Sequence, residues 1–177
     1  MNRRRAMFAL AAAWGALALA AAFAAPASAQ GAPEKIGVFN DWEAYAFTEG
    51  KAKTCYAMTR PRTSEPSGVK RGNVYMMVTY RTQPRTRDEI SVYFGYPLRS
   101  DTGIEASVGT DKFSLFGKDE AAWAPDPRAD RAVVESMAKG ITLTVKGVST
   151  KGTATLDHYS LKGFGAALKA IGAACAN

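Results

Sequence analysis

The chain has 177 residues, of which 47% are hydrophobic, and this length suits a single domain with a buried core. It carries 23 Lys and Arg against 16 Asp and Glu, with one histidine and two cysteines, for a formal net charge of +7. These counts exclude a multi-histidine metal centre and a zinc site of clustered His and Cys, because too few such ligands are present.

The first 29 residues follow the pattern of a secretory signal peptide. Three arginines at positions 3–5 precede an uninterrupted apolar run at 6–23, and Pro26 ends that run. Residues 27–29 (ASA) have the small-x-small spacing that a signal peptidase cleaves. We predict cleavage near Ala29 and ordinary export. The mature chain then loses three arginines, so 20 Lys and Arg face 16 Asp and Glu, a net charge of +4.

An uncleaved membrane anchor is the alternative, since an apolar run of this length can just span a bilayer. No later stretch of the sequence is apolar for long enough, so we expect no transmembrane segment in the mature chain. The predicted location is the periplasm, the outer-membrane surface or the exterior. Each of these is an oxidising compartment, where two cysteines most simply pair with each other.

Apolar and polar side chains alternate along most of the mature chain, as in half-buried β-strands. In residues 73–81, for example, the apolar side chains at every second position from Val74 to Tyr80 fall on one strand face. Ser, Pro and Gly clusters separate such runs as turns. The pattern predicts eight strands, at 38–46, 53–60, 73–81, 89–96, 104–108, 111–116, 141–148 and 152–159.

Two segments change to helical periodicity. Residues 126–140 begin with Asp126 as an N-cap and Pro127 at the first helical position, and Gly140 ends the run. A second helix is predicted at 161–175, capped by Ser160. Its stripe of core-facing residues consists of Phe164, Leu168, Ile171 and Cys175.

Together these elements predict a mainly β fold in one domain covering 30–177. We expect an antiparallel β-sandwich or a partly closed barrel of about eight strands. The two helices, at about 126–140 and 161–175, pack on a face or an end of the sheet.

Basic residues are concentrated in one part of the sequence. Residues 51–87 contain nine Lys and Arg but a single acid, Glu65. The pattern predicts a basic surface for an anionic partner, namely a lipid, a polysaccharide or an acidic protein of the envelope or host. Solubility at strand edges is the other explanation, and nucleic acid is not expected outside the cytoplasm. The predicted surface consists of Lys53, Arg60, Arg62, Lys70, Arg71, Arg81, Arg85 and Arg87.

The sequence nominates no catalytic residues, cofactor or metal. His158 is the single histidine, and its neighbour Asp157 points to the opposite face of the predicted strand. Ser67 and Lys70 match an S-x-x-K pattern, but they lie in a turn and the partner motifs of that chemistry are missing. The enzymatic alternative is a pocket near Trp42 and His158.

The two cysteines, Cys55 and Cys175, are predicted to form a disulfide. This bond would close a loop of about 120 residues and tie the last helix to an early strand. A reactive thiol at Cys55 is the alternative, with Lys53 and Arg60 as nearby cations.

Several blocks of the sequence resemble the invasion-associated locus B family. They are KIGVFNDWEAYAF, GKAKTCYAMTRPRTSEP, KFSLFGKDEAAWA and the stretch from VVESMAKG to GAAC. The resemblance implies an exported, mostly β domain of the bacterial envelope, with no catalytic residues to carry over. The family is named after a locus linked to entry into host cells.

The leading prediction is therefore an exported, non-enzymatic envelope or binding protein that acts through its basic face. An uncharacterised periplasmic enzyme or chaperone-like factor is the alternative. A purely structural envelope component is a third reading.

Overall fold

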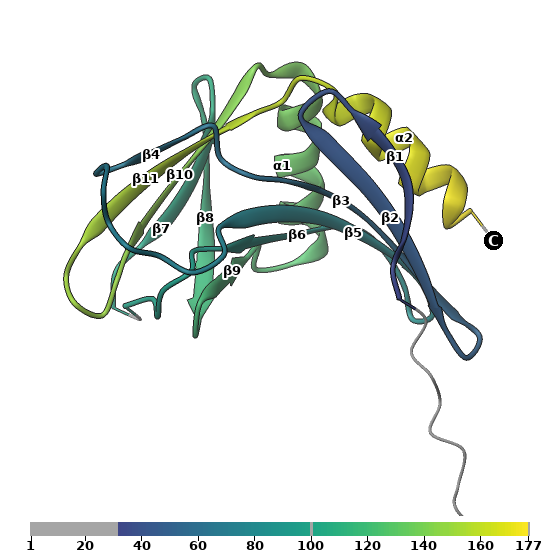
Figure 1. Ribbon diagram of the computed structural model, residues 1–177, viewed down its shortest axis with the longest axis horizontal. Helices are drawn as coiled ribbons and strands as arrows, with labels where there is room; N and C mark the ends of the chain where they lie inside the picture. Colours follow the sequence, from purple (N-terminus) through teal and green to yellow (C-terminus); the bar gives the residue numbers. More distant parts are fainter. Residues whose placement is uncertain (1–31, 100, 177) are drawn as a thin grey trace, which may run out of the picture.

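A computed structural model describes residues 32–99 and 101–176, and the predicted signal peptide lies outside the described residues (Figure 1). The described part forms eleven β-strands and two α-helices. In chain order they are β1 (Glu34–Phe39), β2 (Trp42–Glu49), β3 (Ala52–Thr59), β4 (Thr63–Glu65), β5 (Tyr75–Thr82), β6 (Arg85–Tyr93), β7 (Ile104–Val108), β8 (Asp111–Lys118), β9 (Ala121–Trp123), α1 (Pro127–Lys139), β10 (Thr142–Val148), β11 (Ala154–Ser160) and α2 (Phe164–Ala174).

The strands form one open antiparallel sheet in the order β1-β2-β3-β5-β6-β9-β8-β7-β10-β11-β4. The mainly β, antiparallel class with two helices is confirmed. The sandwich or barrel and the count of about eight strands were wrong. A turn at Asn40 and Asp41 divides the predicted strand 38–46 into β1 and β2, and Asn40 adopts a left-handed φ of 53°. The strands β4 and β9 have three residues each, too few to show alternation.

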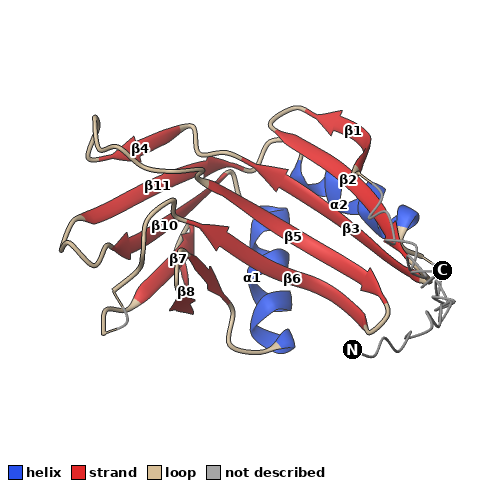
Figure 2. Ribbon diagram, turned by 60° about the horizontal axis from the view of Figure 1, so that its bottom comes forward, coloured by secondary structure: helices blue, strands red, loops and turns tan. Residues whose placement is uncertain are grey.

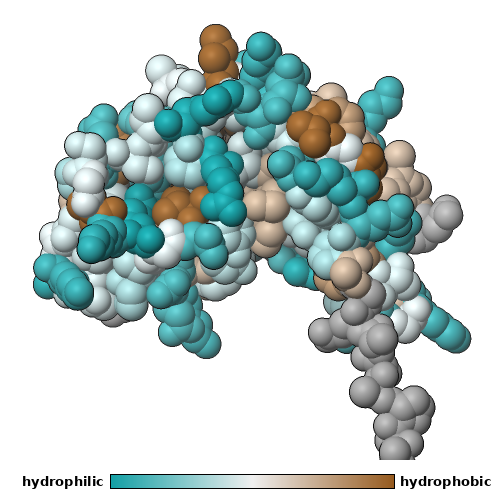
Figure 3. Space-filling model, viewed as in Figure 1, coloured by the Kyte–Doolittle hydropathy of each residue, from teal (hydrophilic) through white to brown (hydrophobic). Residues whose placement is uncertain are grey.

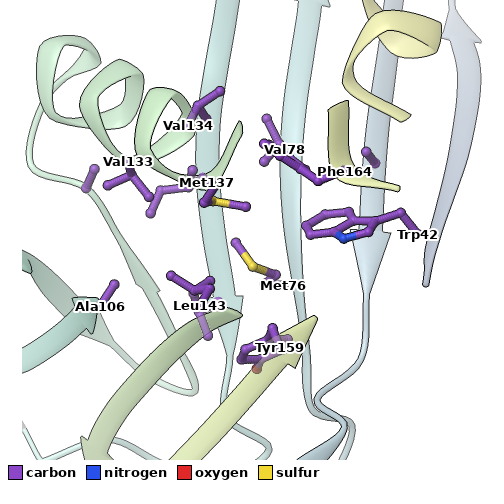
Figure 4. Packing of buried hydrophobic residues seen from close by; sticks show 14 of the residues in the cluster. Trp42, Met76, Val78, Ala106, Val133, Val134, Met137, Leu143, Tyr159 and Phe164 are labelled. Carbon is purple, nitrogen blue, oxygen red and sulfur yellow. The ribbon is translucent and has the colours of Figure 1, made fainter. Parts of the chain in front are cut away.

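Both helices lie on the same face of the β2-β3-β5-β6 part of the sheet, behind the strands in Figure 2. The sheet curves, so side chains from its other half reach the same core (Figure 4). Leu143 of β10 and Tyr159 of β11 point into this core below Met137 of α1, with Met76 of β5 between Tyr159 and Met137. Trp42 and Phe164 anchor α2, with ring centroids 4.8 Å apart and almost no exposed surface.

Helix α1 begins and ends where the sequence predicts. The Asp126 carboxylate accepts hydrogen bonds from the backbone N–H groups of Arg128 and Ala129, which have no partner inside the helix. Pro127 occupies the first turn, and Gly140 is the C-cap. Local capping chemistry therefore sets both ends of this helix.

Helix α2 begins later than predicted. Its N-cap is Gly163 rather than Ser160, which is still part of β11. Gly163 has a φ of +93°, and a Cβ at this position would lie 1.8 Å from the carbonyl oxygen of Phe39. The chain passes so close to the β1–β2 turn that a glycine is needed, and this tertiary contact determines the start of the helix.

Asp130 is a buried carboxyl in the first turn of α1. It accepts a hydrogen bond from the Ile90 N–H of β6 at 2.9 Å and is 8% exposed. Burial raises the pKa of Asp130 to about 6, and the nearby acids Glu89, Asp88 and Asp126 add to the shift, whereas the Ile90 bond opposes it. At neutral pH the Asp130 carboxylate is therefore ionised although its buried position disfavours the charged form.

We predict that Asp130→Asn stabilises the protein above about pH 7 by about 1–2 kcal/mol. The folded carboxyl titrates near pH 6 and the unfolded one near 3.8, so wild-type stability falls as the pH rises between these values. The stability of the Asn variant does not fall with pH in this way, and its amide oxygen can still accept the hydrogen bond from the Ile90 N–H. Urea unfolding from about pH 4 to about pH 8 measures the difference. Asp126→Asn, at an exposed cap, is the control. An equal pH dependence in wild type and Asp130→Asn would contradict the assignment.

Candidate functional site

The predicted basic residues do not form one surface. Lys53 is the second residue of β3, and its N–H donates to the Thr82 hydroxyl at 2.8 Å, next to the β5–β6 hairpin that carries Arg81, Arg85 and Arg87. Arg60 and Arg62 follow the opposite end of β3, whereas Lys70 and Arg71 lie in the connection from β4 to β5. The structure therefore divides the eight residues among three places.

Arg71 is buried instead of exposed. Its guanidinium donates to both carboxylate oxygens of Asp157, each at 2.7 Å, and its Nε donates to the Phe94 carbonyl at 2.9 Å. The Arg71 side chain is 7% exposed and that of Asp157 is fully buried. A buried charge is stable only when it is paired in this way, so Arg71 holds the fold together and is not available to a partner.

Two further cations are neutralised at the surface. Arg62 contacts the carboxylate of Asp41, and Arg81 contacts that of Glu89. In contrast, Arg60 forms no ion pair with any residue that the structure describes. Exposed ion pairs contribute little to stability, but they do cancel charge. Of the two arginines that follow β3, Arg60 is thus the one without a direct ion pair, although its charge acts on Glu43 at longer range.

Arg60 lies beside a surface of aromatic and methionine side chains on the helix-free side of the sheet. We call this surface the tyrosine–methionine face, and Figure 2 looks onto it. Three pairs of side chains on this face lie directly opposite each other on neighbouring strands, namely Tyr45–Tyr56, Met58–Met77 and Tyr75–Tyr93. The rings of Tyr45 and Tyr56 stack with centroids 5.2 Å apart, and those of Tyr75 and Tyr93 at 4.4 Å.

All six side chains of the tyrosine–methionine face are half-buried, so neighbouring residues support them while one side stays open to solvent. Strand alternation sets Arg60 on the same side as Met58. Thr59 is paired with Met76, so Arg60 is the next residue along the register towards Tyr75. Burial raises the pKa of Tyr75, and the charge of Arg60 opposes that rise. The face can therefore offer a rigid apolar surface with one free cation at its edge.

A cleft of about 550 Å³ adjoins this face between the β1–β2 turn and the end of β3. The Thr59 hydroxyl donates to the Asp41 carbonyl at 2.6 Å and fixes the floor of the cleft. The pKa of Glu43 is lowered by the Tyr45 hydroxyl first and by Lys35 next, with a further contribution from the charge of Arg60, so this acid is ionised and already partnered. Arg60 also lines the cleft, and its guanidinium forms no direct ion pair with a described residue.

Trp42 and His158 do not form the pocket that the enzymatic alternative requires. Trp42 is fully buried in the core, where its indole N–H donates to the Ser160 carbonyl at 3.0 Å. His158 points to the other face of β11, since its neighbours Asp157 and Tyr159 are the buried ones. Its Nδ1 lies 3.1 Å from the Thr144 hydroxyl. The enzymatic reading therefore has no geometric support at these residues.

Within residues 32–99 and 101–176, no group of three or more His, Cys, Asp or Glu side chains is placed to hold a metal ion. In the same part of the chain, neither helix has the length and apolar character needed to cross a membrane.

The predicted disulfide between Cys55 and Cys175 is confirmed. The two Cα atoms are 6.1 Å apart, and the bond spans 120 residues of sequence. Cys55 is fully buried in β3, and Cys175 is the C-cap of α2. The bond therefore fastens the C-terminal helix to the strand that leads to Arg60, and no described cysteine is a free thiol.

A family model described as "Invasion associated locus B (IalB) protein" matches residues 42–172 of the chain. The match covers β2 through most of α2 and confirms the resemblance seen in the sequence. A comparison with curated proteins finds no matching relative. The family model says nothing about a ligand or a partner, so these must be argued from the site.

We predict that Cys55→Ser combined with Cys175→Ser lowers the free energy of unfolding by about 4–5 kcal/mol. The disulfide restricts the unfolded chain through a loop of 120 residues, and this restriction is lost in the variant. Guanidinium denaturation measures the loss, and wild-type protein in reductant should show the same decrease. A change of less than about 1 kcal/mol would contradict the proposed role of the bond.

Proposed function

The chain belongs to the invasion associated locus B family, and we propose that it is an exported, non-enzymatic binding protein of the cell envelope. Its partner is a protein that docks on the tyrosine–methionine face. The observation that carries this proposal is an exposed arginine, Arg60, which forms no ion pair with a described residue and lies beside two stacked tyrosine pairs and two methionines on an open sheet face.

The composition of the tyrosine–methionine face supports a protein partner. Tyrosine, methionine and arginine are enriched in the centres of protein–protein interfaces, and lysine and acidic residues are depleted there. Stacked tyrosines are rigid, so little side-chain entropy is lost when a partner binds. Met58 and Met77 lie between the two tyrosine pairs and can adapt their shape to the bound surface.

The charges around the face define the partner's chemistry. Arg62 and Lys35 form direct ion pairs with Asp41 and Glu43, so the guanidinium of Arg60 is the one left without a direct carboxylate contact among these three described cations. A carboxylate on the partner would form a charge-assisted, bidentate contact with its guanidinium. The partner therefore presents apolar side chains with an acidic residue at their edge.

A lipid surface or a long polyanion is less well supported. Such partners favour many cations on one surface, and here the basic residues are divided and partly paired. On the side of the molecule shown in Figure 3, hydrophobic side chains form small separate patches among hydrophilic ones. We therefore replace the predicted basic surface with Arg60 as the charged contact of the protein-binding face.

The predicted export of the chain supports the proposal that it acts in the cell envelope. The signal-peptide pattern of residues 1–29 and the disulfide both suit an oxidising compartment outside the cytoplasm. The link to host cells that the family name carries stays a prediction.

Site-specific photo-crosslinking in the periplasm tests the proposal. A photoreactive residue in place of Met77 should give one discrete product with a partner protein. Arg60→Glu should reduce that product by about tenfold or more, because like charges then meet at the interface. Arg128→Glu is the control, since Arg128 is an exposed arginine on α1.

A photoreactive residue at Ala132, exposed on α1, is the matched control position and should not give the product. Equal crosslinking from positions 77 and 132, or a product that persists in Arg60→Glu, would refute the docking face. A product of twice the chain's own mass would replace the foreign partner with a second copy.

A further inference from the structure

A second cavity lies at the β10–β11 hairpin and shares no lining residue with the cleft beside Arg60. Its volume is about 260 Å³. Three segments line it, namely residues 69–70 of the β4–β5 connection, residues 95–97 after β6, and the hairpin from 149 to 155. The hairpin and this connection lie at the same end of the molecule, on the left in Figure 1.

Backbone contacts fix the walls of this cavity. The Gly72 N–H donates to the Gly95 carbonyl at 2.8 Å, and Gly95 has a φ of +68°. A Cβ on Gly95 would lie 2.8 Å from the Gly72 backbone, so the close approach needs glycine. Because Arg71 is also fixed by Asp157, the two residues that directly follow Lys70 are both held in place at the cavity.

Buried hydroxyl groups supply hydrogen-bond donors to the cavity. Ser149 and Thr155 are 7% and 5% exposed. The Ser149 oxygen accepts a bond from the Thr153 N–H at 3.1 Å and keeps its own hydrogen to donate. The hydroxyls of Tyr96 and Thr155 lie 2.6 Å apart, and that bond uses only one of their two hydrogens. Burial raises the pKa of Tyr96, so it stays a donor at neutral pH.

The charged groups at the cavity are all cationic. Lys70 and Lys151 line it, both are exposed, and neither forms an ion pair with a described residue. No aspartate or glutamate lines it. The guanidinium carbon of Arg71 lies 5.0 Å from the Tyr96 ring centroid, and this cation–π contact helps to hold the ring in position. Donors and cations therefore converge on a space that contains no acceptor carboxylate.

We propose that this cavity is an oxyanion site that binds a phosphate or sulfate group. Its donors come from three chain segments around one space, which suits a tetrahedral anion better than a planar carboxylate. Two lysines act as compact point charges for such a group, as lysine does in other phosphate sites. This inference does not rest on the proposed protein partner, because the two sites share no residue.

Titration with inorganic phosphate, followed by NMR at constant ionic strength, tests the site. The amides of residues 95 and 149–153 should shift and saturate, and sulfate should compete. Lys70→Glu and Lys151→Glu should each weaken binding by about tenfold or more, because a like charge then faces the anion. Lys169→Glu, at an exposed position on α2, makes the same charge change elsewhere and should leave binding unaltered.

Two further ligands identify the source of the oxyanion. A sugar phosphate that binds more tightly than inorganic phosphate would indicate a phosphorylated glycan. Vesicles containing phosphatidylglycerol that bind in a Lys70- and Lys151-dependent way would indicate a lipid. Equal affinity for inorganic phosphate and the sugar phosphate, without vesicle binding, would indicate free phosphate.

Tyr96→Phe removes one donor without changing the charge and should weaken phosphate binding by about threefold or more. The site is refuted if phosphate causes no saturable shift in the wild-type protein. It is equally refuted if Lys70→Glu and Lys151→Glu bind phosphate as tightly as Lys169→Glu does.

Discussion

The buried ion pair between Arg71 and Asp157 is the contact on which the arrangement of the sheet depends. The strand β4 lies at one edge of the sheet and β5 lies near the middle, so the chain between them must cross the molecule. Arg71 fixes that crossing to β11 through Asp157 and to the end of β6 through the Phe94 carbonyl, while Ser64 of β4 donates to the same carboxylate at 2.6 Å. Because an unpaired charge in this interior is costly, the four segments are held together as a unit.

In the other half of the sheet, the disulfide is the contact that joins distant segments. It fastens α2 to β3, and Gly163 lets the same helix start directly against the β1–β2 turn. These two constraints hold an open sheet at two separate places, and each acts on an element that carries one candidate site. The disulfide-bonded strand β3 leads to Arg60 and the tyrosine–methionine face. The ion pair supports Lys70 and the oxyanion cavity.

Local signals in the sequence predicted the elements that local chemistry determines. Alternation located β5, and Asp126 with Gly140 located α1. Features that depend on distant contacts were missed or misassigned. Arg71 was predicted at the surface because its partner lies 86 residues away in the sequence. The pairing of Met58 with Met77, and so the tyrosine–methionine face itself, follows from strand register that alternation alone does not give.

The amide hydrogen exchange of Gly72 tests the central role of the ion pair most directly, because its N–H bond to Gly95 forms at the crossing. Asp157→Asn keeps the shape of the side chain but leaves the charge of Arg71 buried without a counterion. This role of the ion pair predicts that exchange at Gly72 then accelerates by about a hundredfold or more, the equivalent of roughly 3 kcal/mol. Unchanged protection of Gly72 in the folded variant would contradict it.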